Sequence, residues 1–161
     1  MEADLFWPTL LRAPAMPVTL VCGPPASGKS SYVTANAGAS DVVIDVDEIA
    51  REISGSARNP SRDIRYKALA ERNRRLAELA DNFEARAAWF VTTSAAGLLR
   101  ERWARLLRAQ RVLLILTPRS VCMERMIRDP ERRLHIKMQT DILDKWWRNY
   151  YPSKLDSIVR A

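Results

Sequence analysis

Residues 18–33 read VTLVCGPPASGKSSYV and place an apolar run directly before a turn rich in Gly, Pro and Ser. Val18–Cys22 is short, apolar and rich in β-forming residues, which is typical of a buried strand. No helix breaker follows the turn until Gly38, so we expect a helix to begin where the turn ends. The stretch therefore predicts a strand, a tight loop and a helix in direct succession.

The loop fits the pattern G-x-x-x-x-G-K-[ST], with Gly23, Gly28, Lys29 and Ser30 at the fixed positions. The backbone N–H groups of such a loop and the positive end of the following helix bind the phosphates of a nucleotide. The Lys reaches the β- and γ-phosphates, and the Ser hydroxyl is a magnesium ligand. A solvated Gly/Pro turn is the alternative, but the flanking strand and helix favour a nucleotide site. The predicted ATP-binding residues are Gly23, Pro24, Pro25, Ala26, Ser27, Gly28, Lys29, Ser30 and Ser31, with Lys29 also catalytic and Ser30 also a Mg²⁺ ligand.

The whole chain has 161 residues, a formal net charge of +7 and two cysteines. This length suits one core of ordinary size, so residues 1–161 are predicted to form a single domain. Two cysteines are too few for a disulfide framework, and the sequence has no apolar run long enough to span a membrane. The first 17 residues lack the features of a secretory signal, so we expect a cytoplasmic protein without a membrane partner. The positive charge indicates an anionic partner, and a nucleotide already explains part of it.

Apolar runs suited to buried parallel strands recur at residues 18–22, 42–46, 88–92 and 111–116, and residues 157–159 are a candidate for a short last strand. Segments with helical periodicity separate these runs, and this alternation is typical of α/β proteins. The predicted fold is a three-layer α/β/α P-loop NTPase with a mostly parallel sheet of four to five strands.

Two of the separating segments, residues 63–86 and 97–110, have the pattern of amphipathic helices. Their inward faces are predicted to carry Leu69, Leu76, Leu79 and Phe83 in the first helix and Leu99, Trp103, Leu106 and Leu107 in the second. Their outward faces are predicted to carry Arg72, Arg75 and Glu78 in the first and Arg105 and Arg108 in the second.

The second predicted strand ends in two carboxylates, Asp45 and Asp47. Residues two apart in an extended chain project to the same side, and ligands bind at the carboxyl ends of the strands in open α/β sheets. A carboxylate there can accept the proton of an attacking hydroxyl, which is the role predicted for Asp47, while Asp45 holds magnesium. Two alternatives are open: Asp47 caps the next helix, or Asp45 is the acidic residue of an ATPase, although it follows Lys29 more closely than is usual in that class.

The glycine-rich loop and the Asp-x-Asp strand together resemble the P-loop kinases of small hydroxyl acceptors. The resemblance spans most of the chain and is strongest to polynucleotide kinases and zeta toxins, with shikimate and gluconate kinases more distant. It implies an enzyme that uses ATP and Mg²⁺, with Asp47 as the general base. By analogy with these kinases, residues 54–61, SGSARNPS, are predicted to form an acceptor-binding loop.

The third predicted strand departs from one branch of this family. Residues 87–97, AAWFVTTSAAG, lack the Gly-Gly-Gly element of shikimate kinases, which argues against that acceptor. Thr92, Thr93 and Ser94 follow the strand instead. Their hydroxyls are candidates to face the acceptor or a phosphate, and Ser94 is alternatively a helix cap.

Residues 117–133, TPRSVCMERMIRDPERR, resemble the lid of P-loop kinases. Asp129 before Pro130 predicts that one helix ends near Arg128 and another begins at Pro130. The resemblance implies that Arg125 and Arg128 stabilise the transferred phosphoryl group and that Arg132 contacts the nucleotide. The alternative is a solvated basic helix that pairs with its own glutamates. The predicted buried face carries Cys122, Met123, Met126 and Ile127.

The last helical segment carries Leu134, Met138, Ile142 and Trp146 at intervals of four, which predicts an apolar stripe. Trp146, Trp147, Tyr150 and Tyr151 are followed or preceded by basic residues. Core packing is the favoured role for these aromatic residues, and stacking on nucleic-acid bases is the alternative.

These features predict a kinase that transfers the γ-phosphate of ATP to a hydroxyl or phosphate acceptor. The favoured acceptor is a nucleotide or the 5′ end of a nucleic acid, for three reasons. The layout resembles that of polynucleotide kinases, and the glycines typical of shikimate kinases are missing. The outward side chains are predicted to include Arg72, Arg75, Arg105 and Arg108. The alternatives are a nucleotide-binding ATPase or regulatory module without an acceptor, and a small-molecule kinase similar to shikimate or gluconate kinases. The sequence makes no prediction about the oligomeric state.

Overall fold

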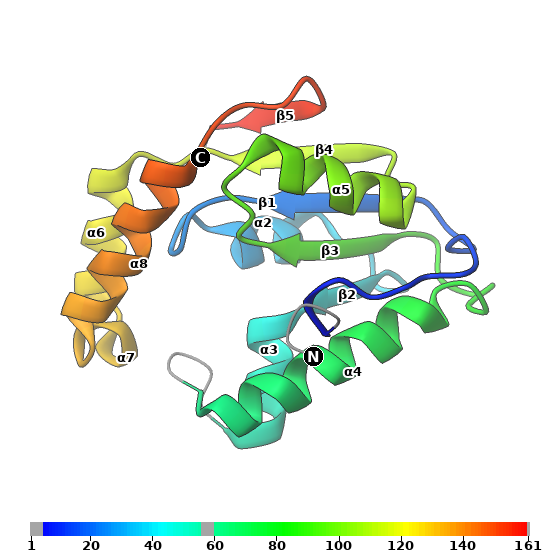
Figure 1. The fold of residues 1–161 in the computed structure, drawn as a ribbon, viewed down its shortest axis with the longest axis horizontal. Helices are drawn as coiled ribbons and strands as arrows, with labels where there is room; N and C mark the ends of the chain where they lie inside the picture. The colour runs from blue at the N-terminus through cyan, green and yellow to red at the C-terminus, as the bar shows by residue number, and fades with distance from the viewer. Residues whose placement is uncertain (1–4, 56–59, 161) are drawn as a thin grey trace.

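The computed structural model describes residues 5–55 and 60–160. Its centre is a sheet in which all neighbouring strands are parallel, in the order β2-β3-β1-β4-β5 (Figure 1). The strands are β1 (Val18–Cys22), β2 (Val42–Asp45), β3 (Ala88–Thr92), β4 (Arg111–Ile115) and β5 (Asp156–Val159). The predicted α/β class and the short last strand are therefore confirmed, and the other strand ends differ from prediction by at most one residue.

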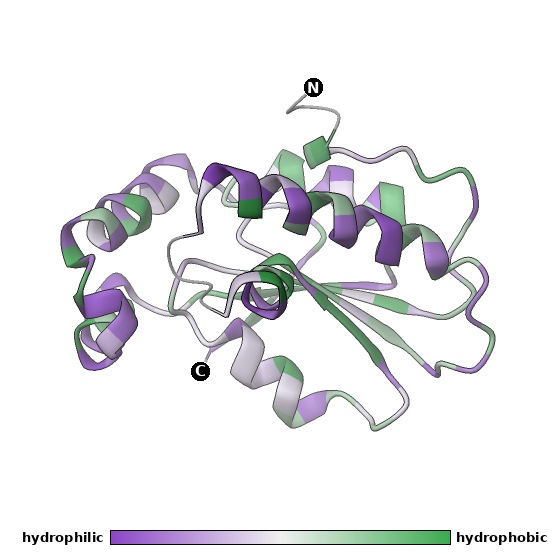
Figure 2. Ribbon diagram, turned by 90° about the horizontal axis from the view of Figure 1, so that it is seen from below, coloured by the Kyte–Doolittle hydropathy of each residue, from purple (hydrophilic) through white to green (hydrophobic). Residues whose placement is uncertain are grey.

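Helices connect the strands and cover both faces of the sheet (Figure 1). They are α2 (Lys29–Asn36), α3 (Val46–Ser54), α4 (Arg62–Glu78), α5 (Gly97–Leu107), α6 (Arg119–Arg128), α7 (Pro130–Arg133) and α8 (Ile136–Asn149). Figure 2 shows that the strands are largely hydrophobic and that the outer sides of the helices are hydrophilic. This is the expected pattern for a sheet that is buried on both faces.

The two faces of the sheet belong to separate hydrophobic clusters because side chains alternate along each strand. Leu20 and Phe90 pack with Trp103 of α5 in the larger cluster. Val21 packs with Val33 of α2 in the smaller one, on the opposite face. The alternation within β1 thus fixes which helices lie on which side of the sheet.

The segment before β1 runs alongside α4 and α5 and covers apolar surface that these helices would otherwise expose (Figure 1). Phe6 and Trp7 both pack on the ring of Trp103, and the N–H of Ala15 donates to the carbonyl of Leu79 at 2.8 Å. The same segment buries Arg72, which is 3 % exposed. The prediction that Arg72 points outward is therefore wrong, because the sequence pattern of α4 alone does not reveal this covering segment.

Helix α4 is shorter than predicted: it ends at Glu78 rather than at residue 86. The side chain of Asn82 accepts hydrogen bonds from the N–H groups of Glu84 and Ala85 at 3.2 and 3.0 Å. Such local side-chain bonds compete with helical backbone bonds. Phe83, expected on the buried face, consequently lies on the surface and is 83 % exposed.

Helix α5 also ends early, at Leu107, because Arg108 adopts a left-handed backbone conformation with φ 50°. Trp103 and Leu107 are buried as predicted, whereas Leu99 is 39 % exposed. Arg105 and Arg108 are exposed, in agreement with prediction.

Helices α6, α7 and α8 form a unit beside the carboxyl ends of the strands (Figure 1). The predicted break is confirmed: the side chain of Asp129 accepts from the N–H groups of Glu131 and Arg132 and caps α7. Cys122 and Met126 of α6 pack on Leu143 of α8 in the centre of this unit.

Two apolar faces predicted for this unit are wrong in part. Ile127 is 51 % exposed. In α8, the buried residues are Gln139, Leu143 and Trp146. Leu134, Met138 and Ile142, three members of the predicted stripe, are partly or largely exposed.

Within residues 5–55 and 60–160, none of the helices combines the length and apolar character needed to cross a bilayer.

A buried ion pair joins α5 to β5. The contact is bidentate: Nε and Nη2 of Arg100 donate to Oδ1 and Oδ2 of Asp156 at 2.8 and 2.7 Å. Arg100 also donates to the carbonyls of Ser94, Ala95 and Tyr151. The pair therefore fixes the loop after β3 against the last strand.

Candidate active site

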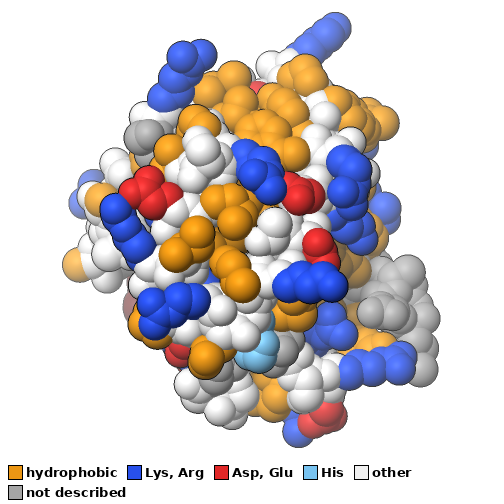
Figure 3. Space-filling view, turned by 90° about the vertical axis from the view of Figure 1, so that its left-hand side faces the viewer, with side chains coloured by type: hydrophobic (Ala, Val, Ile, Leu, Met, Phe, Trp, Pro, Cys, Tyr) orange, Lys and Arg blue, Asp and Glu red, His pale blue; other side chains and the backbone are white. Residues whose placement is uncertain are grey.

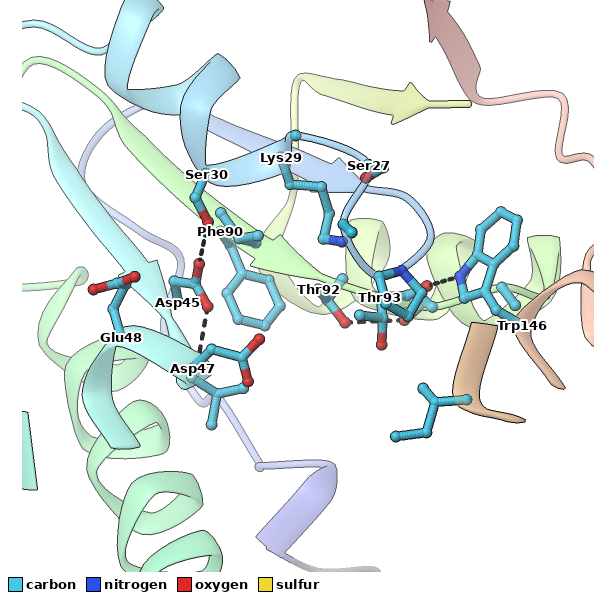
Figure 4. A pocket seen from close by; sticks show the side chains of 18 of the residues that line it. Ser27, Lys29, Ser30, Asp45, Asp47, Glu48, Phe90, Thr92, Thr93 and Trp146 are labelled. Atoms are coloured by element: carbon cyan, nitrogen blue, oxygen red, sulfur yellow. Dashed lines mark hydrogen bonds between the residues drawn. The ribbon is translucent and has the colours of Figure 1, made fainter. Parts of the chain in front are cut away.

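A pocket of about 1150 Å³ opens at the carboxyl ends of β1, β2 and β3. Figure 4 shows Ser30, Asp45 and Asp47 on one side of this pocket, Thr93 and Trp146 on the other, and Lys29 between them. Parallel open sheets bind ligands at this edge, next to the position where the strand order changes direction. Here the change lies at β1, which has β3 on one side and β4 on the other.

The predicted phosphate-binding loop, residues 23–30, links β1 to α2. Gly28 has φ 96°, a left-handed conformation that glycine adopts without steric cost. A Cβ at Gly23 would lie 2.6 Å from the carbonyl oxygen of Ile115, so only glycine fits between β1 and β4. The loop ends at Lys29, where the free N–H groups and the positive dipole end of α2 favour an anion.

Every predicted loop residue lies in or beside the pocket. Residues 25–31 line it. Gly23 and Pro24 lie behind the lining, and their carbonyls accept hydrogen bonds from Nζ of Lys29 at 2.9 and 2.8 Å. Burial lowers the pKa of Lys29 to about 8, and the nearby carboxylates of Asp47 and Asp45 oppose this shift. Among the described residues, the hydrogen-bond acceptors of Lys29 are therefore two neutral carbonyls. A bound phosphate would offset the desolvation cost of the buried ammonium group.

Ser30 and Asp45 meet at the edge of the pocket. The hydroxyl of Ser30 donates to Oδ2 of Asp45 at 3.0 Å. Oδ1 of Asp45 accepts from the N–H of Asp47 at 3.0 Å and caps α3. Burial, and then the charge of Asp47, raise the pKa of Asp45. A hydroxyl next to a carboxylate fits Mg²⁺, which takes one or two protein oxygens and completes its shell with phosphates and water.

The alternative that Asp47 caps the next helix is wrong, because the N-cap of α3 is Asp45. The chain turns into α3 at Val46, so the two carboxylates do not share an extended segment as predicted. Both nevertheless line the same pocket. Asp47 lies in the first turn of α3 and is exposed to the pocket, and its carboxylate is directed toward the space in front of Lys29 in Figure 4.

The three predicted lid arginines do not act as one group. Arg125 lines the pocket and donates from Nη1 to the carbonyls of Ala26 and Ser27 at 3.3 and 2.8 Å. Arg132 also lines it, and its Nη1 donates to the side chain of Gln139 at 2.6 Å. Arg125 therefore connects α6, the first helix of the predicted lid, to the predicted phosphate-binding loop.

The structure does not place Arg128 where the predicted role requires it, because Arg128 is not among the residues that line the pocket. Its side chain is 75 % exposed and pairs with Glu124 at 2.6 Å, one turn earlier on α6. It thus follows the alternative of a solvated basic helix. Figure 3, which faces the α6–α8 end of the molecule, shows many Lys and Arg side chains spread over this surface with apolar side chains between them.

The hydroxyl residues at the end of β3 and directly after it, Thr92, Thr93 and Ser94, all line the pocket. Thr92 Oγ1 and Ser94 Oγ lie 3.2 Å apart. Ser94 is not a helix cap, since the N-cap of α5 is Ala96. The carbonyl of Thr93 accepts a hydrogen bond from Nε1 of Trp146, which is 5 % exposed. Trp146 therefore packs in the wall of the pocket, which agrees with the packing role that the sequence analysis favoured over stacking on nucleic-acid bases.

Several pocket residues escape the sequence prediction. Phe6, Leu69, Arg72 and Phe90 line the wall beside Asp47. Only their convergence in the fold identifies them, because none belongs to a recognisable motif. The predicted acceptor-binding loop, 54–61, lies partly outside the described residues, which exclude 56–59.

Comparison with known proteins agrees with this fold. A family model described as an AAA domain matches residues 18–152, most of the chain. None of the curated proteins matches the chain.

Two solved structures are similar in fold. A candidate kinase from Chloroflexus aurantiacus is 15 % identical, with a TM-score of 0.60, and the match covers 91 % of this chain and 86 % of that one. A chain of the Pnkp1/Rnl/Hen1 RNA repair complex is also 15 % identical, with a TM-score of 0.55; the match covers 84 % of this chain and 46 % of that one. The chain belongs to the AAA domain family, and its fold is that of P-loop kinases, as its sequence predicts.

Proposed function

We propose that this protein is a kinase that uses Mg²⁺ and ATP to phosphorylate a hydroxyl group. The observation that carries the proposal is the convergence of three elements on one pocket: the phosphate loop with Lys29, the Ser30–Asp45 pair and the carboxylate of Asp47. Each element has a separate task in phosphoryl transfer, namely binding of the phosphates, ligation of the metal and removal of the acceptor proton.

In the proposed reaction, the acceptor oxygen attacks the γ-phosphorus of ATP, the bond from that phosphorus to the β,γ-bridging oxygen breaks, and ADP leaves. Asp47 accepts the proton of the attacking hydroxyl. Lys29 and Arg125 stabilise negative charge on the phosphates. Ser30 and Asp45 would hold Mg²⁺, which when bound neutralises phosphate charge.

The pocket extends well beyond the phosphate loop, and this supports a kinase over an ATPase or regulatory module without an acceptor. Its wall beside Asp47 contains aromatic, aliphatic and hydroxyl side chains from the N-terminal segment, β3 and α4. A mixed surface of this kind suits an organic acceptor.

For the acceptor, we favour a molecule of the size of a mononucleotide over a long nucleic acid strand. Arg75 is engaged by Glu52 and Glu71. Arg105 and Arg108 lie toward the end of α5, close to where Gln110 donates to the carbonyl of Val18. Val18 begins β1, so these arginines are at the edge of the sheet opposite the pocket. A small sugar or polyol derivative is the second candidate.

The proposed function is tested by incubating the protein with γ-labelled ATP and Mg²⁺ and separate sets of nucleosides, nucleotides, short 5′-hydroxyl oligonucleotides and polyols or their acids. Transfer of label to one set supports a kinase and names its acceptor. Release of inorganic phosphate at the same rate with and without every acceptor contradicts it and favours an ATPase.

A further inference from the structure

Arg72 is a buried cation in the wall of the pocket. It lies on α4, lines the pocket and is 3 % exposed. Its Nη2 donates to the carbonyls of Phe6 and Leu5 at 2.7 and 3.1 Å, and both Nε and Nη2 donate to Oδ1 of Asn73. The guanidinium is thus held in a fixed orientation by neutral oxygens.

Aromatic rings surround the same guanidinium. Its central carbon lies 5.0 Å from the ring centroid of Trp103, 5.5 Å from that of Phe6 and 6.0 Å from that of Phe90. Such rings stabilise a cation only in part and replace little of the water that it loses on burial. The loss of that water lowers the pKa of Arg72 to about 10.

No carboxylate of the described residues pairs with Arg72, and among them its Nη1 has no hydrogen-bond partner. Arg100, which is also buried, differs in this respect, since it has the two carboxylate oxygens of Asp156. A buried charge is normally paired. Within residues 5–55 and 60–160, Arg72 therefore has an oriented donor without a partner and a charge without a counter-charge, at the wall of the pocket.

We propose that Arg72 binds an anionic group of the acceptor, so that the substrate of this pocket is a hydroxyl compound bearing a phosphate monoester or a carboxylate. This inference rests on the proposed function, because the ligand is an acceptor only if the protein is a kinase. The acceptor hydroxyl lies at Asp47, at the start of α3, and the anionic group lies at Arg72, on the helix packed against α3. Phe6, Leu69 and Phe90 form the apolar wall that contacts the body of the molecule.

The test measures equilibrium binding of matched compounds to the full chain, with the nucleotide site filled by a non-hydrolysable ATP analogue and Mg²⁺. One pair is a nucleoside and its 3′-monophosphate, and the other is a polyol and the corresponding sugar acid. Ionic strength is held constant, because general attraction to a basic protein falls with salt. We expect the charged member of one pair to bind at least about tenfold more tightly than its neutral partner.

Variants separate charge recognition from support of the fold. Arg72→Gln keeps an amide donor near the position of Nε, which donates to Oδ1 of Asn73, but removes the charge, and we expect the preference for the charged compound to fall to about twofold or less. Arg72→Lys keeps the charge and should retain much of the preference. Arg74→Gln is the matched control on the same helix, because Arg74 is exposed and pairs with Glu71 and Glu78 outside the pocket.

The pair that shows the preference identifies the anion as phosphate or carboxylate. Equal binding of charged and neutral members in both pairs, binding by none of the four, or an unchanged preference in a folded Arg72→Gln protein overturns the inference. Anion preference that depends on Arg72 without any phosphoryl transfer would sustain this inference and contradict the proposed function instead.

Discussion

The hydroxyl of Ser30 lies 3.0 Å from Oδ2 of Asp45 and connects the first turn of α2 to the end of β2. The two residues follow strands that are not neighbours, because β3 separates β1 from β2 in the sheet. Their contact therefore depends on the whole sheet and brings two Mg²⁺-type ligands together at its carboxyl edge. Asp45 at the same time caps α3 and so fixes the start of the helix that carries Asp47.

Replacement of Asp45 by Asn is expected to have opposite effects on the free and the ligand-bound protein. Burial raises the pKa of Asp45, so the contribution of this group to stability is lost as pH rises from the unfolded pKa through the folded pKa, and the charged carboxylate is less favourable in the folded state than in the unfolded state. Asn keeps a capping oxygen without that charge. In thermal melts at neutral pH, Asp45→Asn should raise the Tm of the free protein.

The same variant should lose the extra stabilisation that Mg²⁺ adds to ATP, because a neutral amide is a weaker ligand for this cation. The measurement is the difference in Tm between Mg²⁺-ATP and ATP with EDTA. Asp63→Asn, which removes an exposed carboxylate on α4 paired with Lys67, is the control. A full Mg²⁺ effect in Asp45→Asn would exclude Asp45 as a ligand.

Lys29→Ala should remove most of the thermal stabilisation by Mg²⁺-ATP. A ligand at 100 times its Kd adds about 2.7 kcal/mol to the folded state, which corresponds to roughly 5–10 °C for a domain of this size. Lys67→Ala, at an exposed lysine of α4, is the matched control and should keep the full shift. Equal shifts in the two variants would contradict nucleotide binding at the loop.

ATP binding should take up protons near pH 8. The pKa of Lys29 is about 8 in the free protein, so about half of the Lys29 side chains are neutral at that pH. Bound phosphate favours the charged form and raises this pKa. Calorimetry in two buffers of different ionisation enthalpy should therefore detect up to about half a proton taken up per ATP, and affinity should fall above pH 8.

Lys29→Arg provides the control for that titration, since arginine keeps its charge across the whole range. It should bind ATP with no uptake from this position. Identical uptake by both proteins would assign the proton to another group.

The Arg100–Asp156 pair should matter far more for stability than an exposed pair of similar geometry. Arg100→Met leaves the carboxylate of Asp156 buried and unpaired, with an expected loss of about 3–5 kcal/mol in the free energy of unfolding. Arg119→Met breaks an exposed pair with Asp144 and should lose less than about 1 kcal/mol. Urea unfolding measures both, and equal losses would refute the structural role of the buried pair.

The sequence predicts the sheet and the phosphate loop well because both are encoded by contiguous residues. The local pattern of Val18–Cys22 and of the loop after it is sufficient to predict a strand, a tight loop and a helix in succession. Asp129 before Pro130 likewise identifies a helix boundary from two residues. Local chemistry is sufficient wherever a segment is buried or capped by its own neighbours.

Prediction fails where a distant segment decides which side of a helix is covered. Arg72 is buried because residues near Phe6 pack over α4, and Gln139 of α8 is buried and accepts a hydrogen bond from Arg132 of α7. Ile142, apolar and in phase with Trp146, remains 46 % exposed. The wall of the pocket beside Asp47 depends on such long-range packing, so the sequence predicts the candidate phosphate loop but not the wall proposed to bind the acceptor.

The most direct test of the proposed mechanism compares Asp47→Asn with the wild type in ATP binding and in label transfer to the identified acceptor. A general base contributes about 10²–10⁴-fold, so transfer should fall at least about 100-fold while ATP affinity stays within a few-fold, because the role proposed for Asp47 is toward the acceptor and not toward ATP. Asp63→Asn should leave both unchanged. Full transfer activity in Asp47→Asn would contradict the assignment of Asp47 as the base and, with it, the proposed mechanism.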